Sequence, residues 1–405
     1  MEVWNEGKIR DFADVKGGKR LPKGKQLITE ANSHPYIRIR DLGKGKILEL
    51  NSDYEYVDDE TQKSIARYIV DAGDILISVV GTIGLIAIVG GSLDKANQTE
   101  NCDKIINLKG INRDYLYYYL VSPAGQEEIK RGTVGAVQPK LPLKNVQDIN
   151  IKYPSLETQE KIVSILSSID DKISINEVIN RNLQEQMQTI FSSIFYPKIE
   201  KENKVSLGDY LYIKGRIGWK GLKKEEYLDD SEYRIINGES LTTTGIDWKK
   251  AGYISEERYT ESPEIMLQVG DILISKDGTI GKIGYVDKLE KPTSVASGLF
   301  VVRNLKPEEV STVFIYCLLN SDYFRKFIAS RTEGSVIPHL YQKDFVTLEV
   351  PLLSGKQLEY FNNSVVPLFD LYFANQTENL RLVELRDALL PKLMSGELDV
   401  SDLDI

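Results

Sequence analysis

The sequence contains few of the side chains on which metal and cofactor chemistry depends. Its 405 residues include two cysteines and two histidines, and the cysteines, Cys102 and Cys317, do not form a Cys-x-x-Cys motif. A disulfide framework, a thiolate zinc site and a histidine metal cluster are therefore disfavoured, and a reducing cytoplasm is the expected location. Neither the GxxxxGK(S/T) phosphate loop nor the GxGxxG dinucleotide fingerprint occurs, so no catalytic centre is indicated.

The sequence also lacks a segment that would target a membrane. Its start, MEVWNEGKIRDF, has no apolar core of a signal peptide. Gly73–Leu93, GDILISVVGTIGLIAIVGGSL, is uncharged after its second residue. The phrase returns at Gly270–Leu289 with Lys276, Asp277 and Lys282 in the places of Val79, Val80 and Leu85. Because charged groups are costly at the centre of a bilayer, we expect two buried strands joined by a Gly-Thr turn instead.

The chain consists of two tandem copies of a unit of roughly 200 residues. The phrase G-D-I-L-I-S-x-x-G-T-I-G begins at Gly73 and again at Gly270, an offset of 197 residues. Strand-like runs and turns in each copy, with an aromatic helix-like segment near Asp114–Ile129, predict an α+β globular domain. Further matches, at offsets near 199, pair Tyr115–Ser122 with Phe314–Ser321, Val137–Ile151 with Val336–Val350, and Pro35–Leu42 with Glu232–Leu241.

Each copy ends in a helix with a heptad seam, where apolar residues recur at spacings that alternate between four and three. The first seam comprises Ile162, Leu166, Ile169, Ile173, Asn176, Asn180, Leu183, Met187, Ile190 and Ile194. The second, 199 residues later, comprises Phe361, Val365, Leu368, Tyr372, Asn375, Asn379, Leu382, Arg386, Leu389 and Leu393. Asparagines at the same depth of both seams predict that the two helices pair with each other.

These patterns predict an α+β fold with an approximate two-fold internal repeat. Residues 1–152 and 201–352 form the globular domains, and residues 153–200 and 353–405 form two long helices that pair as an antiparallel coiled coil and hold the domains apart. The alternative is that each amphipathic helix packs on its own globular domain. Pro367 predicts a kink or restart in the second helix, and Pro391 and Gly396 mark its expected end.

Positive charge gathers at one place in each copy, although the whole chain has a formal net charge of −9. The two basic loops lie in FADVKGGKRLPKGK and YIKGRIGWKGLKK, where glycines interleave with the bases, so the loops can follow a phosphate backbone closely. The alternative is that they are solvated surface loops. From these loops and the neighbouring PYIRIRDL we predict DNA-binding residues, Lys16, Lys19, Arg20, Lys23, Lys25, Arg38 and Arg40 in the first copy and Lys214, Arg216, Lys220 and Lys223 in the second.

Residues that read bases should lie in loops next to the matched segments and should differ between the copies. The candidates are Thr82, Gln138 and Lys140 in the first copy and Lys276, Thr279 and His339 in the second. An amide can bridge adenine, and a lysine can reach guanine. The alternative is that these are ordinary exposed loop side chains.

The whole chain resembles the specificity subunit (HsdS) of type I restriction-modification systems. Three features carry the resemblance: the repeated strand-turn phrase, the helix entries IKYPSLETQEKIVSILSSIDDKI and EVPLLSGKQLEYFNNSVVPLFDLY, and the closing phrase LRDALLPKLMSGEL. Family members usually have Glu-Gln at the helix entry, whereas this chain has Thr158-Gln159 and Lys356-Gln357.

The resemblance implies two target recognition domains that each read one half of a bipartite site in double-stranded DNA, with the helices setting the gap and docking partners. Those partners are two modification (methyltransferase) subunits that carry S-adenosylmethionine and motor-nuclease restriction subunits that use ATP. This chain is then non-catalytic, binds no cofactor or metal of its own, and acts in the cytoplasm. Two alternatives remain: a coiled-coil scaffold or adaptor that does not bind DNA, and a nuclease or methyltransferase in its own right.

Overall fold

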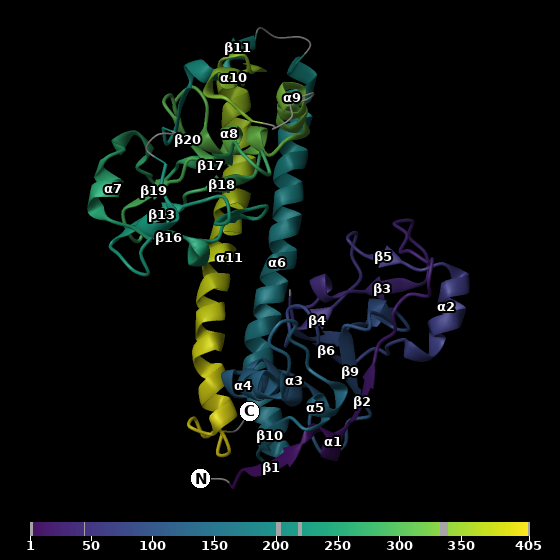
Figure 1. Ribbon diagram of the computed structural model, residues 1–405. Helices are drawn as coiled ribbons and strands as arrows, with labels where there is room; N and C mark the ends of the chain where they lie inside the picture. The colour runs from purple at the N-terminus through teal and green to yellow at the C-terminus, as the bar shows by residue number, and fades with distance from the viewer. Residues whose placement is uncertain (1–2, 44, 200–203, 218–220, 333–338, 404–405) are drawn as a thin grey trace. The chain divides into compact units, whose positions relative to one another are not determined.

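The computed structural model describes residues 3–43, 45–199, 204–217, 221–332 and 339–403 (Figure 1). The chain divides into two compact units: unit 1 comprises residues 1–175 and 378–405, and unit 2 comprises residues 176–377. We call the part of unit 1 that precedes its first long helix head 1, and the part of unit 2 between the two long helices head 2. Among the described residues, no helix is long and apolar enough to cross a membrane.

Head 1 is built from a five-stranded sheet, a three-stranded sheet and a two-stranded ribbon. The five-stranded sheet has the order β2(Asp14–Gly17)-β9(Cys102–Ile106)-β6(Ile75–Ser78)-β7(Ile86–Val89)-β4(Ile47–Leu48). The three-stranded sheet is β5(Glu55–Tyr56)-β3(Pro35–Ile37)-β8(Asn97–Gln98), and β1(Asn5–Lys8) pairs with β10(Asn150–Tyr153). The helices are α1(Ile9–Phe12), α2(Asp59–Ile65), α3(Arg113–Val121), α4(Pro123–Gly132) and α5(Leu143–Gln147).

Head 2 repeats this plan, which confirms the predicted internal repeat. Its main sheet, β12(Leu211–Gly215)-β20(Leu299–Asn304)-β17(Ile272–Ser275)-β18(Ile283–Tyr285), has the strand order of β2-β9-β6-β7 in head 1. Its other strands form β16(Gly252–Ile254)-β13(Tyr233–Ile236)-β19(Thr293–Val295), β14(Leu241–Thr242) with β15(Gly245–Ile246), and β11(Lys204–Ser206) with β21(Glu349–Pro351). The helices are α7(Glu256–Thr260), α8(Thr312–Leu319), α9(Asp322–Thr332) and α10(Gln342–Val346).

The repeated phrase G-D-I-L-I-S-x-x-G-T-I-G forms the same strand-turn-strand in both heads. Gly81 has φ of 76° and Gly278 has φ of 65°, a left-handed conformation that favours glycine. The hydroxyl of Ser78 donates to the Thr82 carbonyl over 2.6 Å, and the Ser275 hydroxyl donates to the Thr279 carbonyl over the same distance. The predicted pair of buried strands joined by a Gly-Thr turn is therefore correct.

Two long helices, α6(Leu156–Ile199) and α11(Gly355–Ser395), each contribute one segment to each unit. In unit 2, the Asn375 side-chain amide donates to the Asn180 side-chain oxygen over 2.9 Å. In unit 1, the Arg386 guanidinium donates to the Asp170 carboxylate over 3.1 Å. The helices therefore pair in an antiparallel direction, as the matched asparagines predict.

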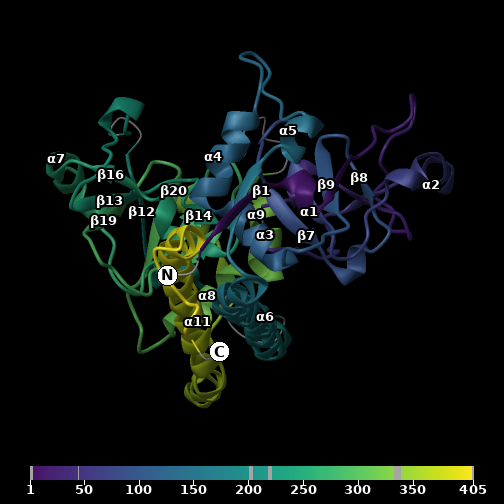
Figure 2. The same cartoon turned by 90° about the horizontal axis from the view of Figure 1, so that it is seen from below.

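The long helices pack on the heads in addition to pairing with each other. In unit 2, Phe314 of α8 lies 5.3 Å from Phe191 of α6 and 5.5 Å from Phe361 of α11, measured between ring centroids. In unit 1, α3 contacts both strand β7 and helix α6 (Figures 1 and 2). Each helix therefore needs an apolar stripe wider than a heptad seam.

In each unit, a hydrophobic core runs from the head sheet onto both long helices. Helix α11 passes through Pro367 without interruption. It begins at Gly355, so this proline lies three turns into the helix and does not restart it. Pro391 also lies inside α11, whereas Gly396, with φ of 76°, ends the helix as expected.

Candidate nucleic-acid interface

The structure brings the predicted base-reading segments together in both heads by the same backbone hydrogen bond. In head 1, the Leu141 N–H donates to the Val79 carbonyl over 2.9 Å, and Lys140 forms a bridge with Val80. In head 2, the Leu340 N–H donates to the Lys276 carbonyl over 3.1 Å. We call these places the hairpin patches, formed by Thr82, Gln138 and Lys140 in head 1 and by Lys276, Asp277, Thr279 and His339 in head 2.

The hairpin patch of head 2 combines a histidine, a carboxylate and a partly buried lysine. His339 Nδ1 pairs with the Asp277 carboxylate, and the Tyr341 ring lies 4.5 Å from the imidazole, measured between centroids. The Lys276 ammonium lies 4.9 Å above the centroid of the Phe300 ring. Burial lowers the pKa of Lys276, and Asp277 opposes that shift. Thr279 is exposed.

The strand residue next to the hairpin patch of head 1 differs from its counterpart in head 2. Asp103 on β9 faces Gly17 in the register and is 5% exposed. Burial raises the pKa of Asp103 to about 6, and the nearby Lys140 acts in the opposite direction. Phe300 occupies the matching place in head 2, because it pairs with Ile274 as Asp103 pairs with Ile77. Thr82, Gln138 and Lys140 are all exposed, as a contact with DNA requires.

The raised pKa of Asp103 predicts a pH-dependent stability of unit 1. Folding disfavours the charged carboxylate, so stability is lost as the pH rises from the ordinary value of 3.8 through about 6. Asp103→Asn is expected to increase the free energy of unfolding by about 1–3 kcal/mol above about pH 7 and to change it little below about pH 4. Hydrogen exchange of the β9 amides measures this change.

The control for this prediction is Asp171→Asn, which changes an exposed carboxylate on α6 and should alter stability little at either pH. A destabilised Asp103→Asn chain at neutral pH would contradict the prediction.

The basic loop of head 1 is exposed but partly engaged within the protein. Arg20 pairs with Glu100 over 2.7 Å and Lys25 pairs with Asp58 over 3.0 Å, while the Lys19 ammonium lies 5.5 Å from the Tyr68 ring centroid. Lys16 and Lys23 are exposed. Exposed ion pairs contribute little to stability, so Arg20 and Lys25 can exchange their partners for phosphate at small cost.

Arg38 and Arg40 lie beside this loop and converge on one carboxylate. The Arg38 guanidinium pairs with Glu55, and Arg40 Nη2 donates to Glu55 over 3.2 Å. The Asp41 carboxylate fixes the turn by accepting from the Arg38 N–H over 2.7 Å. The two arginines are therefore held by the protein in defined positions.

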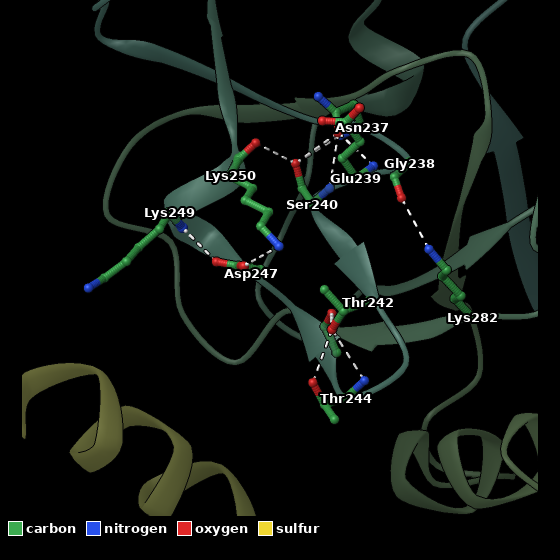
Figure 3. A network of polar contacts seen from close by, with 11 residues as sticks. Asn237, Gly238, Glu239, Ser240, Thr242, Thr244, Asp247, Lys249, Lys250 and Lys282 are labelled. Carbon is green, nitrogen blue, oxygen red and sulfur yellow. Dashed lines mark hydrogen bonds and ion pairs between the residues drawn. The ribbon is translucent and has the colours of Figure 1, made fainter. Parts of the chain in front are cut away.

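The matching turn of head 2 is stabilised by other side chains. Asn237 occupies the place of Arg38, and its side-chain oxygen accepts from the N–H groups of Glu239 and Ser240 over 2.8 Å and 3.0 Å (Figure 3). Ser240 donates to the Lys250 carbonyl over 2.8 Å, and Lys282 reaches the Gly238 carbonyl over 3.3 Å. The backbone frame is kept while the exposed chemistry differs.

The basic loop of head 2 departs from the sequence prediction at Arg216. This side chain is 2% exposed and donates to the Val295 carbonyl over 3.2 Å, so its burial is incompatible with a phosphate contact in this structure. Burial also lowers its pKa. Lys214 is half-buried beside the Tyr212 ring, and Lys223 is exposed. Lys220 lies outside the described residues.

The sequence patterns missed two polar clusters. In unit 1, Lys46 donates to Ser167 of α6 over 2.8 Å, and Tyr118 donates to Asp170 over 2.7 Å. Asp170 also accepts a hydrogen bond from the Arg386 guanidinium, which explains why a charged residue occurs in the second seam. The signal was present as the one charged residue in the two seams, but its partner lies 216 residues away.

The second cluster gives the charged residues of the head 2 motif separate partners. Asp271 is fully buried and is held by Arg303 over 2.7 Å and 2.8 Å. Asp277 pairs with His339, and Lys282 binds a backbone carbonyl. Over the described ranges of the chain, no group of three or more His, Cys, Asp or Glu residues is placed to hold a metal.

Comparison with known proteins gives consistent relatives along the whole chain. The family model for the "Type I restriction modification DNA specificity domain" matches residues 1–185 and 200–354. The MjaIX type I restriction enzyme specificity subunit of Methanocaldococcus jannaschii is 26% identical over 99% of this chain and 94% of that protein. The HindI specificity subunit of Haemophilus influenzae is 22% identical over 70% of this chain and 77% of that protein.

A solved crystal structure also resembles this fold. The crystal structure of a type I restriction-modification S subunit from M. genitalium aligns with a TM-score of 0.58 at 20% identity, covering 97% of this chain and 96% of that one.

Proposed function

The chain belongs to the family of type I restriction-modification DNA specificity subunits, and from this premise we propose that each head reads one half of a bipartite site in double-stranded DNA. The observation that carries the proposal is the pair of hairpin patches. Both are built on the same backbone hydrogen bond, 2.9 Å and 3.1 Å long, yet they present different side chains. A common frame with exchanged exposed groups is what two readers of different half-sites need.

The basic loops and the long helices have further roles in this function. The basic loops contact phosphate, which positions each head on the duplex, and α6 and α11 set the gap between half-sites and dock two modification subunits. This chain contributes no catalysis. S-adenosylmethionine and ATP are bound by the modification and motor-nuclease subunits.

Mapping of methylated adenines by long-read sequencing tests this proposal in the host genome. A chromosome with the intact gene is expected to show methylation at a split motif, and deletion of the gene should remove that motif entirely. An unchanged methylation pattern after deletion, or purified assemblies that show no salt-dependent retention on DNA, would favour a scaffold that does not bind DNA.

The basic loop of head 1 supplies a prediction about affinity. Replacing Lys16, Lys19 and Arg20 by alanine is expected to weaken binding of the assembled complex to all DNA sequences. It should also flatten the plot of log affinity against log salt by about 0.9 for each phosphate contact that is lost. Fluorescence anisotropy over a range of salt concentrations measures both effects.

A matched control removes the same charge elsewhere on head 1. Lys63, Lys109 and Lys130 are exposed and lie outside the basic loop. Their triple alanine variant should leave the salt slope nearly unchanged, and equal effects of the two variants would remove the loop from the interface.

The helices supply a prediction about spacing. Deleting seven residues from α6 and seven facing residues from α11 shortens both by about 10 Å, close to the length of about three base pairs at 3.4 Å each. We expect the tolerated gap to shorten while the two half-site sequences stay the same. Methylome mapping of the deletion strain shows either outcome, and a changed half-site with an unchanged gap would contradict the role of the helices.

A further inference from the structure

The hairpin patch of head 1 lies beside a carboxylate to which the protein offers no hydrogen bond. Asp103 on β9 is 5% exposed, and in the part of the chain that the structure describes its buried Oδ2 atom has no hydrogen-bond partner. The nearby Lys140 lowers the pKa of this carboxyl, but burial has the larger and opposite effect. Because burial of a carboxylate that lacks a hydrogen bond is unfavourable, Asp103 destabilises the fold around it.

Head 2 shows that the fold does not need a carboxylate at this position. Phe300 pairs with a glycine on one neighbouring strand and an isoleucine on the other, as Asp103 does in head 1. Phe300 is 4% exposed and belongs to the hydrophobic core of unit 2. An apolar residue therefore serves the sheet well here. A residue that opposes core packing without a structural need is expected at a functional site.

Asp103 also lies next to a segment that we propose to read bases. The neighbouring strand β6 leads into Val79, whose carbonyl accepts the Leu141 N–H and so holds Lys140 at the hairpin. On the other side of Asp103, Gly17 has no side chain, and a methyl group added there would lie 3.3 Å from Oδ1. The carboxylate is therefore flanked by an exposed lysine and by a bare stretch of backbone.

We propose that Asp103 and Lys140 together read one C·G base pair in the major groove, with Asp103 accepting from cytosine N4 and Lys140 donating to the guanine. This inference rests on the proposed function and deepens it. An ionised carboxylate only accepts hydrogen bonds, and cytosine presents N4 as its donor, whereas guanine presents the acceptors O6 and N7. The exposed Lys140 side chain turns toward the guanine, which opens the approach to the carboxylate.

The same pair of side chains discriminates against the other bases. Guanine or thymine in the place of the cytosine would direct the acceptor O6 or O4 at Asp103, and adenine would place its N7 acceptor beside its N6 donor. Each of these leaves a buried negative charge facing an acceptor, which adds repulsion to the lost hydrogen bond. We expect about tenfold weaker binding when this C·G pair is replaced, the scale of one good base contact.

The experiment uses the complete chain assembled with its modification subunits and duplexes in which each position of the mapped site is replaced in turn. Competition fluorescence anisotropy is measured at about pH 8, above the pKa of about 6 of Asp103. The wild-type complex should prefer C·G at one position of one half-site. Asp103→Asn should move that preference toward A·T, because an amide bridges adenine N6 and N7. Asp103→Ala should reduce the preference at that position to less than about twofold.

A double-variant cycle tests whether the two side chains act as a pair. Lys140→Met removes the ammonium, so the carboxylate next to DNA loses its compensating charge. This change should weaken binding to the full site by about tenfold in the wild-type chain and by less in the Asp103→Asn chain. Additive effects of the two substitutions would overturn the paired contact.

The matched control is Asp71→Asn, which removes an exposed carboxylate of head 1. Asp71 precedes β6, at the end of the strand away from the hairpin, and pairs with Lys95. This variant should leave the base preference unchanged at every position. Equal changes with Asp71→Asn and Asp103→Asn would assign the effect to the charge of the head and overturn the contact. Circular dichroism melting verifies that each variant is folded, and Asp103→Asn is expected to be at least as stable as the wild type at this pH.

The outcomes separate this inference from the function on which it rests. An Asp103→Asn complex that keeps the wild-type preference at every position would overturn the inference alone. A wild-type complex that selects no DNA sequence would instead overturn the proposed function.

Discussion

Replacing Arg303 by methionine is expected to destabilise unit 2 by about 3–5 kcal/mol, the usual effect of leaving a buried carboxylate without its partner. Asp271 is fully buried, and both of its oxygens accept from Arg303, over 2.7 Å and 2.8 Å. The same guanidinium donates to the Met266 carbonyl over 3.0 Å.

Hydrogen exchange of the β17 amides measures this effect within unit 2, since a chain of two units need not unfold in one step. The control is Arg325→Met, which breaks an exposed ion pair with Asp322. The side chain of Arg325 is 67% exposed and that of Asp322 is 70% exposed. It should change stability by less than about 1 kcal/mol. A double variant, Asp271→Leu with Arg303→Met, should recover much of the loss. Equal effects of Arg303→Met and Arg325→Met would show that the buried pair is not needed.

Replacing Phe361 by alanine is expected to destabilise unit 2 by about 3–5 kcal/mol, in the range for a fully buried phenylalanine. Phe361 is 0% exposed, and its ring lies 5.5 Å from that of Phe314 in the head. The cavity would open where α11, α6 and α8 share one core. The loss should therefore appear in the exchange of amides in the head as well as in those of the helices.

The neighbouring Tyr360 provides the matched control, because it is 62% exposed on the same turn of α11. Tyr360→Ala should change stability by less than about 1 kcal/mol. A Phe361→Ala chain in which only the helix amides exchange faster would contradict the single shared core and favour helices that rest loosely on the head.

Local sequence patterns predicted those features that depend on the backbone of one segment. The repeated phrase with its glycines predicted a strand-turn-strand, because a left-handed turn needs glycine at positions such as Gly81 and Gly278. The seams predicted paired helices, because their period and their matched asparagines lie on one face of each helix. The hydrogen bond between Asn375 and Asn180 bears this out.

Contacts between distant segments were beyond the reach of those patterns. Arg216 stands in a basic, glycine-rich loop, yet its guanidinium is buried against Val295 because β19 passes beside it. Phe191 and Phe195 fall outside the heptad seam but are fully buried, since α6 packs on head 2 as well as on α11. Asp277 stood out in the sequence only as a charge added in the second copy of the repeated phrase, and its partner His339 lies 62 residues away.

The sequence by itself determined the duplication, the strand-turn motif, the two long helices and the family, because each of these is recorded in the order and spacing of residues along one stretch of chain. Only the tertiary structure decided which charged side chains face outward and which are buried, as Lys140 and Arg216 show. The reason is that burial and ion pairing depend on neighbours brought together by folding. The sequence around a residue does not indicate which distant residues it will contact.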